Sequence, residues 1–294
     1  MSIIDFLIAC IPILSWGMVP VISTLIGGKA IEQSFGIAIG SFIFAIVVYA
    51  IRKPELNPHI IWIGLASGLF WALGSVCQYK GLKYLGVSKS MPISNGTQII
   101  GTSLLGVFLG DWATSNSKIF GFIALAMIII GIVFTSYKQP EEGKKGEKIQ
   151  WGRGIAVNLL STLGFTLYVG ILKYFGIDGW SSLLPQSVGQ IIGVTLIAFL
   201  FFKINPYNFT AMKNSIVGVV WAIGNLAILV SQMKLGLSVA YPVGQASIIV
   251  SVIAGVYINK EKKTRKEWIS AIIGMSIIVL GLFFIYLSGV YDKS

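Results

Sequence analysis

The chain has 294 residues, of which 55% are hydrophobic and 11% are charged, and its mean hydropathy is +0.83. A soluble domain carries roughly 25% charged residues, so this composition excludes an ordinary water-soluble fold and predicts an integral membrane protein. The net charge of +11 lies in short basic clusters between long apolar runs, which indicates membrane topology and contact with anionic lipid headgroups instead of nucleic-acid binding.

Ten apolar runs follow one another along the chain, each close to the roughly 20 residues that a spanning helix needs. A helix satisfies its own backbone hydrogen bonds in lipid, and the runs lack the alternating pattern of a membrane barrel. The sequence therefore predicts an all-α membrane protein of about ten transmembrane helices. We place these at residues 2–22, 32–51, 60–80, 91–110, 118–137, 154–172, 184–202, 215–232, 238–258 and 268–290.

A basic linker at residues 138–153 divides the chain into a first unit of five helices, 1–137, and a second, 154–294. On the side of the first residue the loops carry six Lys and Arg residues, and on the other side they carry sixteen, which together make all 22. The positive-inside rule then predicts a cytoplasmic linker and places both termini outside the cell (inner) membrane.

The two units match when the first is shifted by 150 residues without a gap. Trp71 then falls on Trp221 and Pro92 falls on Pro242, and several glycines and aliphatic residues also coincide. The alternative is chance agreement in a sequence of such apolar composition, but Trp and Pro are rare enough to argue against chance. An odd number of helices per unit inverts the second copy, and inverted repeats with a solute site between them are typical of secondary transporters.

Polar and aromatic residues within the runs recur at i, i+3, i+4 and i+7, which places them on single helix faces. They are uncharged donors and acceptors beside aromatic rings, as the hydroxyls and C–H face of a sugar require. The alternative is that they join helices to one another, at about 0.6 kcal/mol each. The candidate substrate-binding residues are Trp16, Trp71, Ser75, Gln78, Asn95, Gln98, Asn158, Tyr168, Gln186, Gln190, Trp221, Asn225, Tyr241 and Gln245.

No charged residue lies in mid-span, which favours a small neutral polar solute, most simply a monosaccharide. Proton-driven uptake usually needs a carboxylate within the membrane. The candidates for proton coupling are Glu32 and Asp178, although both lie near helix boundaries, where a solvated carboxylate is ordinary. Pro92 and Pro242 mark either helix starts or hinges.

Other kinds of site have little support in the sequence. One histidine and two isolated cysteines predict no metal site, no disulfide and no cofactor. A membrane-embedded enzyme would need a nucleophile–base pair, a carboxylate dyad or metal ligands within the spans, and we find none. Small residues four apart predict close helix packing, and they leave the oligomeric state open.

Several segments carry a family resemblance, above all SKSMPIS (Ser88–Ser94), FWALG (Phe70–Gly74) and VWAIGN (Val220–Asn225). With the ten-helix count, the chain resembles the bacterial glucose/ribose uptake porter family of the drug/metabolite transporter superfamily. The resemblance implies two inverted five-helix repeats and proton-driven monosaccharide import. The segment Tyr241–Gln245 departs from the glucose-type pattern, which leaves the sugar open. An exporter or importer of another neutral metabolite or a drug on the same fold is the alternative.

Overall fold

The computed structural model describes residues 2–85, 87–139, 150–258, 260 and 262–292, and within these ranges it contains helices and no β-strand. This confirms the prediction of an all-α, multi-span membrane protein. The helices are α1 (Ile3–Ile26), α2 (Ala30–Arg52), α3 (Pro58–Leu85), α4 (Val87–Phe108), α5 (Ser115–Thr135), α6 (Trp151–Tyr174), α7 (Gly179–Ile197), η1 (Ala198–Phe202), α8 (Phe209–Lys213), α9 (Ser215–Leu235), α10 (Leu237–Gln245), α11 (Ser247–Tyr257) and α12 (Arg265–Tyr291).

Nine helical segments of the described chain are long and apolar enough to cross a membrane, with α10 and α11 together making one of them. The tenth passage is α4, whose first half reads VSKSMPISNGTQ and is too polar to qualify by composition. Its 22 residues still reach about 33 Å at 1.5 Å per residue, enough for a hydrocarbon core of roughly 30 Å. A polar helix of full length must face protein or water, so α4 is expected beside a cavity.

Three local features differ from the predicted helices. The single helix expected at 238–258 is broken at Ala246 into α10 and α11, four residues after Pro242. The helix expected at 184–202 changes to a π-helical turn at Ala198, and the short helix α8 was not expected. The side chain of Pro92 lies outside the described part of the structure, so its suggested hinge role stays a prediction.

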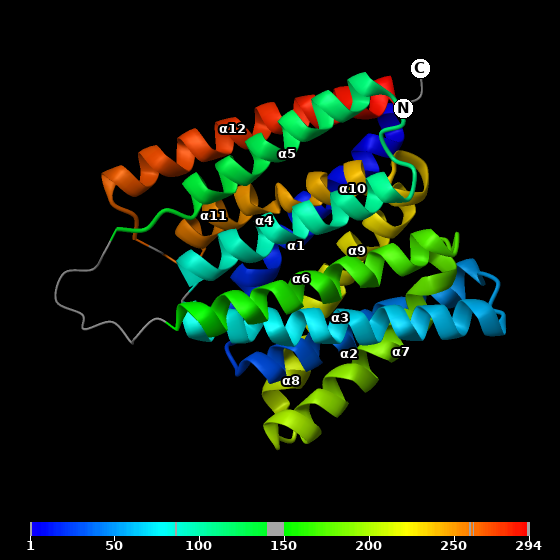
Figure 1. Cartoon of the computed structure of the whole chain (residues 1–294). Helices are drawn as coiled ribbons and strands as arrows, with labels where there is room; N and C mark the ends of the chain where they lie inside the picture. Colours follow the sequence, from blue (N-terminus) through cyan, green and yellow to red (C-terminus); the bar gives the residue numbers. More distant parts are fainter. Residues whose placement is uncertain (1, 86, 140–149, 259, 261, 293–294) are drawn as a thin grey trace.

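The bundle has two ends, which we name by the segments found there (Figure 1). The terminal end holds the start of α1, the end of α12 and the α4–α5 connection. The linker end holds the end of α5, the start of α6 and the start of α12. Residues 140–149 of the predicted linker lie outside the described residues.

Helices of one half pack mainly against helices of the other half. α3 lies between α6 and α7, α9 lies against α1 and α2, and α5 lies along α12. Glycines permit the closest approaches: a Cβ on Gly68 of α3 would overlap the backbone of α7, and one on Gly218 of α9 would overlap that of α2. Related halves are expected to pack in this reciprocal way: α3 of the first half contacts α6 and α7, and α9 of the second half contacts α1 and α2. The division into two inverted repeats stays a prediction.

Candidate functional site

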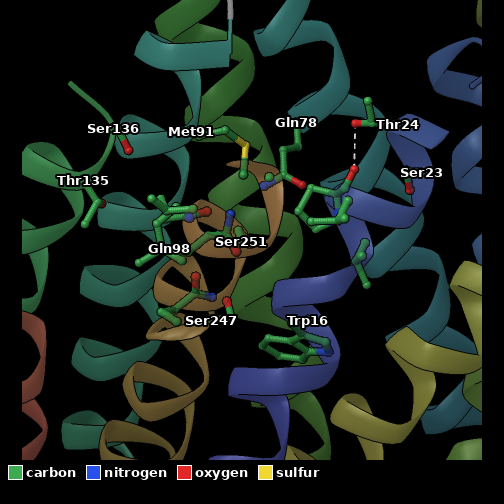
Figure 2. A pocket seen from close by; sticks show the side chains of 18 of the residues that line it. Trp16, Ser23, Thr24, Gln78, Met91, Gln98, Thr135, Ser136, Ser247 and Ser251 are labelled. Atoms are coloured by element: carbon green, nitrogen blue, oxygen red, sulfur yellow. Dashed lines mark hydrogen bonds between the residues drawn. The ribbon is translucent and has the colours of Figure 1, made fainter. Parts of the chain in front are cut away.

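A cavity of about 940 Å³ extends from the middle of the bundle to the linker end. Its wall comes mainly from α1, α3, α4, α6, α9, α10 and α11, and its mouth lies beside the end of α5 and the start of α12. A volume of this size is within the roughly 300–1,000 Å³ typical of small-molecule sites. Figure 2 shows Trp16 of α1, Gln78 of α3, and Met91 and Gln98 of α4 approaching the same space.

Aromatic rings form the deep part of the cavity. The indole of Trp16 stacks on that of Trp221 with ring centroids 6.4 Å apart and planes 10° apart. The ring centroids of Trp71 and Trp221 lie 5.0 Å apart, and Tyr241 meets Trp16 edge to face with ring centroids 6.0 Å apart. The Trp16 Nε1–H donates to the Trp221 carbonyl oxygen at 3.1 Å, which fixes the orientation of the ring. The site therefore offers fixed apolar faces to a solute.

The glycine that permits this arrangement is Gly224, the repeat partner that a shift of 150 residues assigns to Gly74. A Cβ on Gly224 would lie within 2.7 Å of two atoms of the Trp16 indole. Gly224 therefore lets α1 approach α9 closely enough for the two indoles to stack.

Uncharged polar groups converge on the wall from α3, α4 and α10. Gln78 Nε2 donates to Ser94 Oγ at 3.0 Å, and Gln98 Nε2 donates to the same hydroxyl at 2.8 Å. Tyr241 Oη donates to Gln98 Oε1 at 2.8 Å. Asn95 also lines the cavity, and its amide makes no hydrogen bond within the described part of the chain. Its donor and acceptor are therefore available to a solute.

The short helix α10 separates the cavity from the terminal end. All nine of its residues, Leu237–Gln245, are buried, and two of them, Tyr241 and Gln245, line the cavity. The break at Ala246 turns the chain into α11, where Ser247 and Ser251 continue the wall. Broken helices beside midplane sites are a recurring feature of secondary transporters.

Nine of the fourteen candidate substrate-binding residues line this one cavity, and five do not. The nine are Trp16, Trp71, Gln78, Asn95, Gln98, Tyr168, Trp221, Tyr241 and Gln245. The five that lie elsewhere are Ser75, Asn158, Gln186, Gln190 and Asn225, and all of them are buried between helices. Their proposed contact with substrate stays a prediction.

Most of these five side chains form hydrogen bonds between helices, which explains why they are polar and buried. Ser75 Oγ lies 2.9 Å from Ser34 Oγ of α2. Asn158 Nδ2 donates to Ser90 Oγ at 3.0 Å and to the Gly154 carbonyl at 2.9 Å. These groups join helices, which is the alternative role that their composition allowed.

The remaining three form a polar layer between α3, α7 and α9, outside the cavity wall. Gln186 Nε2 donates to Ser67 Oγ at 2.7 Å, and Asn225 Nδ2 donates to Gln186 Oε1 at 2.7 Å. The Asn225 Oδ1 and Gln190 Oε1 atoms are buried without a hydrogen-bond partner among the described residues.

Neither candidate for proton coupling lines the cavity. Glu32, at the start of α2, accepts from the Lys29 N–H at 2.7 Å and from Asn208 Nδ2 at 3.0 Å. Asp178 is the N-cap of α7 and accepts from the Trp180 N–H at 2.8 Å. Both carboxylates therefore hold helix starts in the conformation described here.

Some wall residues were not among the candidates. Phe165 lies on the same face of α6 as Tyr168, and the periodicity of that face was a signal for it. Tyr79 and Met91 also line the cavity, but an ordinary apolar position gives no signal of a cavity behind it. Ser247 and Ser251 are spaced i, i+4 on α11, directly after the break at Ala246, and that spacing was the signal for them.

The mouth of the cavity is charged, unlike its depth. Lys138, Lys262 and Lys263 line it together with Glu267. Glu267 accepts from the Thr264 N–H at 2.9 Å and the Gln139 N–H at 2.8 Å, so it caps α12 and binds the end of α5. Glu267 is the one carboxylate residue among the described lining residues. The described residues also contain no group of three His, Cys, Asp or Glu side chains arranged to hold a metal ion.

Comparison with known proteins gives the family. The model of the family described as "Sugar transport protein" matches residues 7–288. The chain belongs to this sugar transport family. It is 40% identical over 276 residues to a "Probable glucose uptake protein GlcU" of Bacillus cereus, covering 94% of this chain and 96% of the relative. It is 37% identical over 282 residues to the "Glucose uptake protein GlcU" of Bacillus subtilis, covering 96% and 97%.

A "Putative sugar uptake protein" of Listeria monocytogenes is 39% identical over 280 residues, covering 94% of this chain and 96% of the relative. A solved structure named only "Crystal structure of protein" has a TM-score of 0.70 over the full length of both chains at 15% identity, which shows a shared fold. The family assignment confirms the resemblance to bacterial glucose uptake porters and identifies a multi-pass transport protein.

Proposed function

We propose that this transporter imports a monosaccharide, glucose or ribose, across the cell membrane by alternating access. Relatives named as glucose uptake proteins cover nearly the whole chain, which supports a sugar as the solute. The observation that carries the proposal is the cavity itself, because its deep wall combines indole and phenol rings with uncharged amides. In this proposal the linker end faces the cytoplasm, and the structure is the conformation open to that side.

The wall chemistry fits a sugar ring in two ways. The C–H face of a pyranose packs on the exposed parts of Trp16, Trp221 and Tyr241, as apolar surfaces do. The hydroxyls exchange hydrogen bonds with the amides of Asn95 and Gln98, which both donate and accept. A neutral wall also keeps the binding free energy modest, so the sugar can leave towards the cytoplasm.

Alternating access in this proposal is a rocking of one five-helix unit against the other around the midplane site. Helices α3 and α9, which each pack against two helices of the opposite half, occupy corresponding places in the predicted repeat. Gly68 of α3 lies close to the backbone of α7, and Gly218 of α9 lies close to that of α2. Such close contacts allow each packed pair of helices to move as one body.

Proton coupling, implied by the family resemblance, is part of the proposal, with Glu32 as the first candidate and Asp178 as the second. Glu32 lies next to Gln33, which lines the cavity at the linker end. We expect Glu32→Gln to lose the stimulation of uptake by an inward proton gradient, while Asp178→Asn keeps it. Equal stimulation in wild type and both variants would remove these two carboxylates from the coupling.

The leading experiment is uptake of labelled glucose and ribose into proteoliposomes. We expect saturable uptake of at least one sugar, and its loss in Trp221→Ala. Trp62→Ala is the matched control, because Trp62 lies on α3 with 70% of its surface exposed and outside the cavity. Absence of saturable uptake of both sugars, with correctly folded protein, would refute the sugar assignment.

A second candidate function is transport of another neutral metabolite or a drug. The volume of about 940 Å³ favours it, because this is near the upper limit for drug-sized sites and leaves space around one monosaccharide. A thermal-shift screen with neutral metabolites and sugars distinguishes the two: stabilisation by sugars alone supports the first candidate.

A further inference from the structure

The Asp111 carboxylate, in the connection after α4, joins three separate elements at the terminal end. Its side chain is only 9% exposed. Asp111 Oδ1 forms an ion pair and hydrogen bond with Lys173 Nζ of α6, and the Lys173 side chain is itself only 14% exposed. Asp111 Oδ2 accepts from the Ser238 N–H in the first turn of α10 at 2.9 Å.

The surroundings are shaped to this carboxylate. A Cβ on Gly106 of α4 or on Gly236 before α10 would overlap Asp111, and Gly236 also has a positive φ of 89°. The backbone N–H groups at the start of α10 have no partner within the helix, and an acidic side chain there is favourable. Charged side chains that are this little exposed are costly unless they are paired, so a retained pair is expected to have a function.

The ion pair lies at the start of α10 and does not line the main cavity. A second, smaller cavity of about 260 Å³ is lined by Asp111, Lys173 and Gly236 at the terminal end. The main cavity is lined by Tyr241 and Gln245, further along the same helix. Helix α10 thus begins beside the smaller cavity and ends in the wall of the main cavity, and we call it the partition between them.

Hydrogen bonds hold this partition to α4 along its length. Besides the bond to Asp111, Ser238 Oγ donates to the Ser103 carbonyl at 2.8 Å. Tyr241 Oη donates to Gln98 Oε1 at 2.8 Å, within the cavity wall. Movement of α10 away from α4 would therefore break these hydrogen bonds and change the solute-binding wall.

Four other carboxylates of the described residues lie at the terminal end. Asp178 caps the start of α7, Glu55 lies in the α2–α3 connection, and Asp5 and Asp292 bind other elements. Asp5 of α1 pairs with Lys234 of α9 at 2.9 Å, where the Lys234 side chain is 58% exposed. Asp292, after α12, accepts from the Ala113 N–H. None of the four is hydrogen-bonded to α10 within the described chain, whereas Asp111 is, so Asp111 is the carboxylate placed to control the partition.

We propose that the Asp111–Lys173 pair is the latch of the terminal-end gate. The closed latch holds α6, the α4–α5 connection and the start of α10 together, as in this structure. Separation of the pair frees α10 and opens the solute cavity to the terminal end. The proposal rests on the alternating access proposed above, but it does not depend on which solute is carried.

Distances between spin labels test the latch without any sugar present. In a background with Cys10→Ser and Cys77→Ser, one label pair goes at the terminal end on Tyr174→Cys of α6 and Asn116→Cys of α5. A second pair goes at the linker end on Arg153→Cys of α6 and Arg265→Cys of α12. All four native residues are exposed.

Asp111→Asn keeps the shape of the side chain and an acceptor for Ser238 but removes the charge, and Lys173→Met is the second variant. For both we expect a longer-distance population to appear at the terminal end and a shorter one at the linker end. Asp5→Asn is the matched control, since it breaks an ion pair at the same end without contacting α10, and it should leave both distributions unchanged.

Unchanged distributions in folded Asp111→Asn and Lys173→Met protein would overturn the latch, and so would an equal shift in Asp5→Asn. If only one variant folds, its distributions decide the matter. Failure of the sugar assignment is a separate result: absent glucose and ribose uptake in the wild type, with shifted distances in Asp111→Asn, would keep the latch and remove the sugar.

Discussion

The two ends of the bundle are held together by different chemistry. At the terminal end, Asp5, Asp111 and Asp292 each bind a different pair of elements. At the linker end, contacts through Glu267 and Ser270 join α5 to α12, while the mouth of the cavity lies open beside them. Carboxylates thus join the elements of the closed end, and uncharged rings and amides lie in the deep wall where a solute would bind.

This difference has a physical reason. A charge in the deep wall would bind ions and charged solutes, and it would be costly to carry through the membrane during a conformational change. An ion pair near the surface costs less to separate, because water solvates each partner once the end opens. Strong contacts that break on hydration suit a gate, and weaker uncharged contacts suit a site that must release its ligand.

The largest expected effect is a loss of stability on substituting one glycine of α4, compared with substituting another glycine of the same helix. A Cβ on Gly106 of α4 would overlap Ser238 and Asp111 at the closed end, whereas one on Gly96 comes no closer than 3.6 Å to any atom outside the helix. Gly106→Ala is expected to destabilise the protein by about 1–3 kcal/mol, as over-packing does. Gly96→Ala should be near neutral. Thermal melting in detergent checks this, and equal losses would contradict the difference between the ends.

The next prediction concerns the aromatic rings of the deep cavity wall. Trp16→Ala removes the stack on Trp221, and such aromatic contacts contribute about 0.5–1.5 kcal/mol. We expect the apparent KM for sugar uptake to rise by about 2- to 10-fold. Trp16→Phe keeps an aromatic face but loses the donor to the Trp221 carbonyl, so its rise should be smaller. Equal KM values in both variants and wild type would exclude Trp16 from the site.

Two asparagines allow a comparison between a residue of the cavity wall and a residue that only joins helices. Asn95 lines the cavity without a hydrogen bond to any of the described residues, while Asn158 is fully buried and bonded to Ser90. Asn95→Ala should weaken sugar affinity by about 0.5–1.5 kcal/mol, the net value of a hydrogen bond, without lowering the melting temperature. Asn158→Ala should lower the melting temperature and leave the affinity of the folded fraction unchanged. Isothermal titration and melting curves distinguish the two, and the reverse pattern would contradict the placement.

The smallest effect is expected at Asp5. Its partner Lys234 is largely exposed, and surface ion pairs contribute about 0–1 kcal/mol. Asp5→Asn should therefore change neither uptake nor melting temperature measurably. A loss as large as that of Asp111→Asn would show that exposure is a poor guide to which pair closes the terminal end.

Composition and periodicity predicted the helices well. A segment that crosses the bilayer needs about 20 residues and must hydrogen-bond its own backbone, so few alternatives to a helix exist. All ten predicted spans correspond to observed helical segments, including α4 despite its polarity. The break at Ala246 was not predicted, because Pro242 is the visible signal and the chain bends one turn later. The two halves were proposed from matched Trp and Pro residues, and that division still awaits a direct test.

The site was only partly predictable, since a helical face shows direction but not what lies opposite. Trp71 and Gln78 of α3 point into the cavity, whereas Ser75, between them, points at Ser34 of α2. The sequence cannot distinguish these cases, because both put a polar side chain in the interior. Asp111 and Lys173 lie 62 residues apart in different halves, so their pairing appears only in the folded structure.

Side-specific protection of Asn95→Cys by sugar tests most directly whether one uncharged cavity, open at the linker end, binds the solute. In a background with Cys10→Ser and Cys77→Ser, a membrane-impermeant maleimide is applied to right-side-out and inside-out vesicles. We expect rapid labelling from the side of the linker, slowed by glucose or ribose in a concentration-dependent way. Labelling only from the side of the termini, or labelling that neither sugar slows, would contradict it.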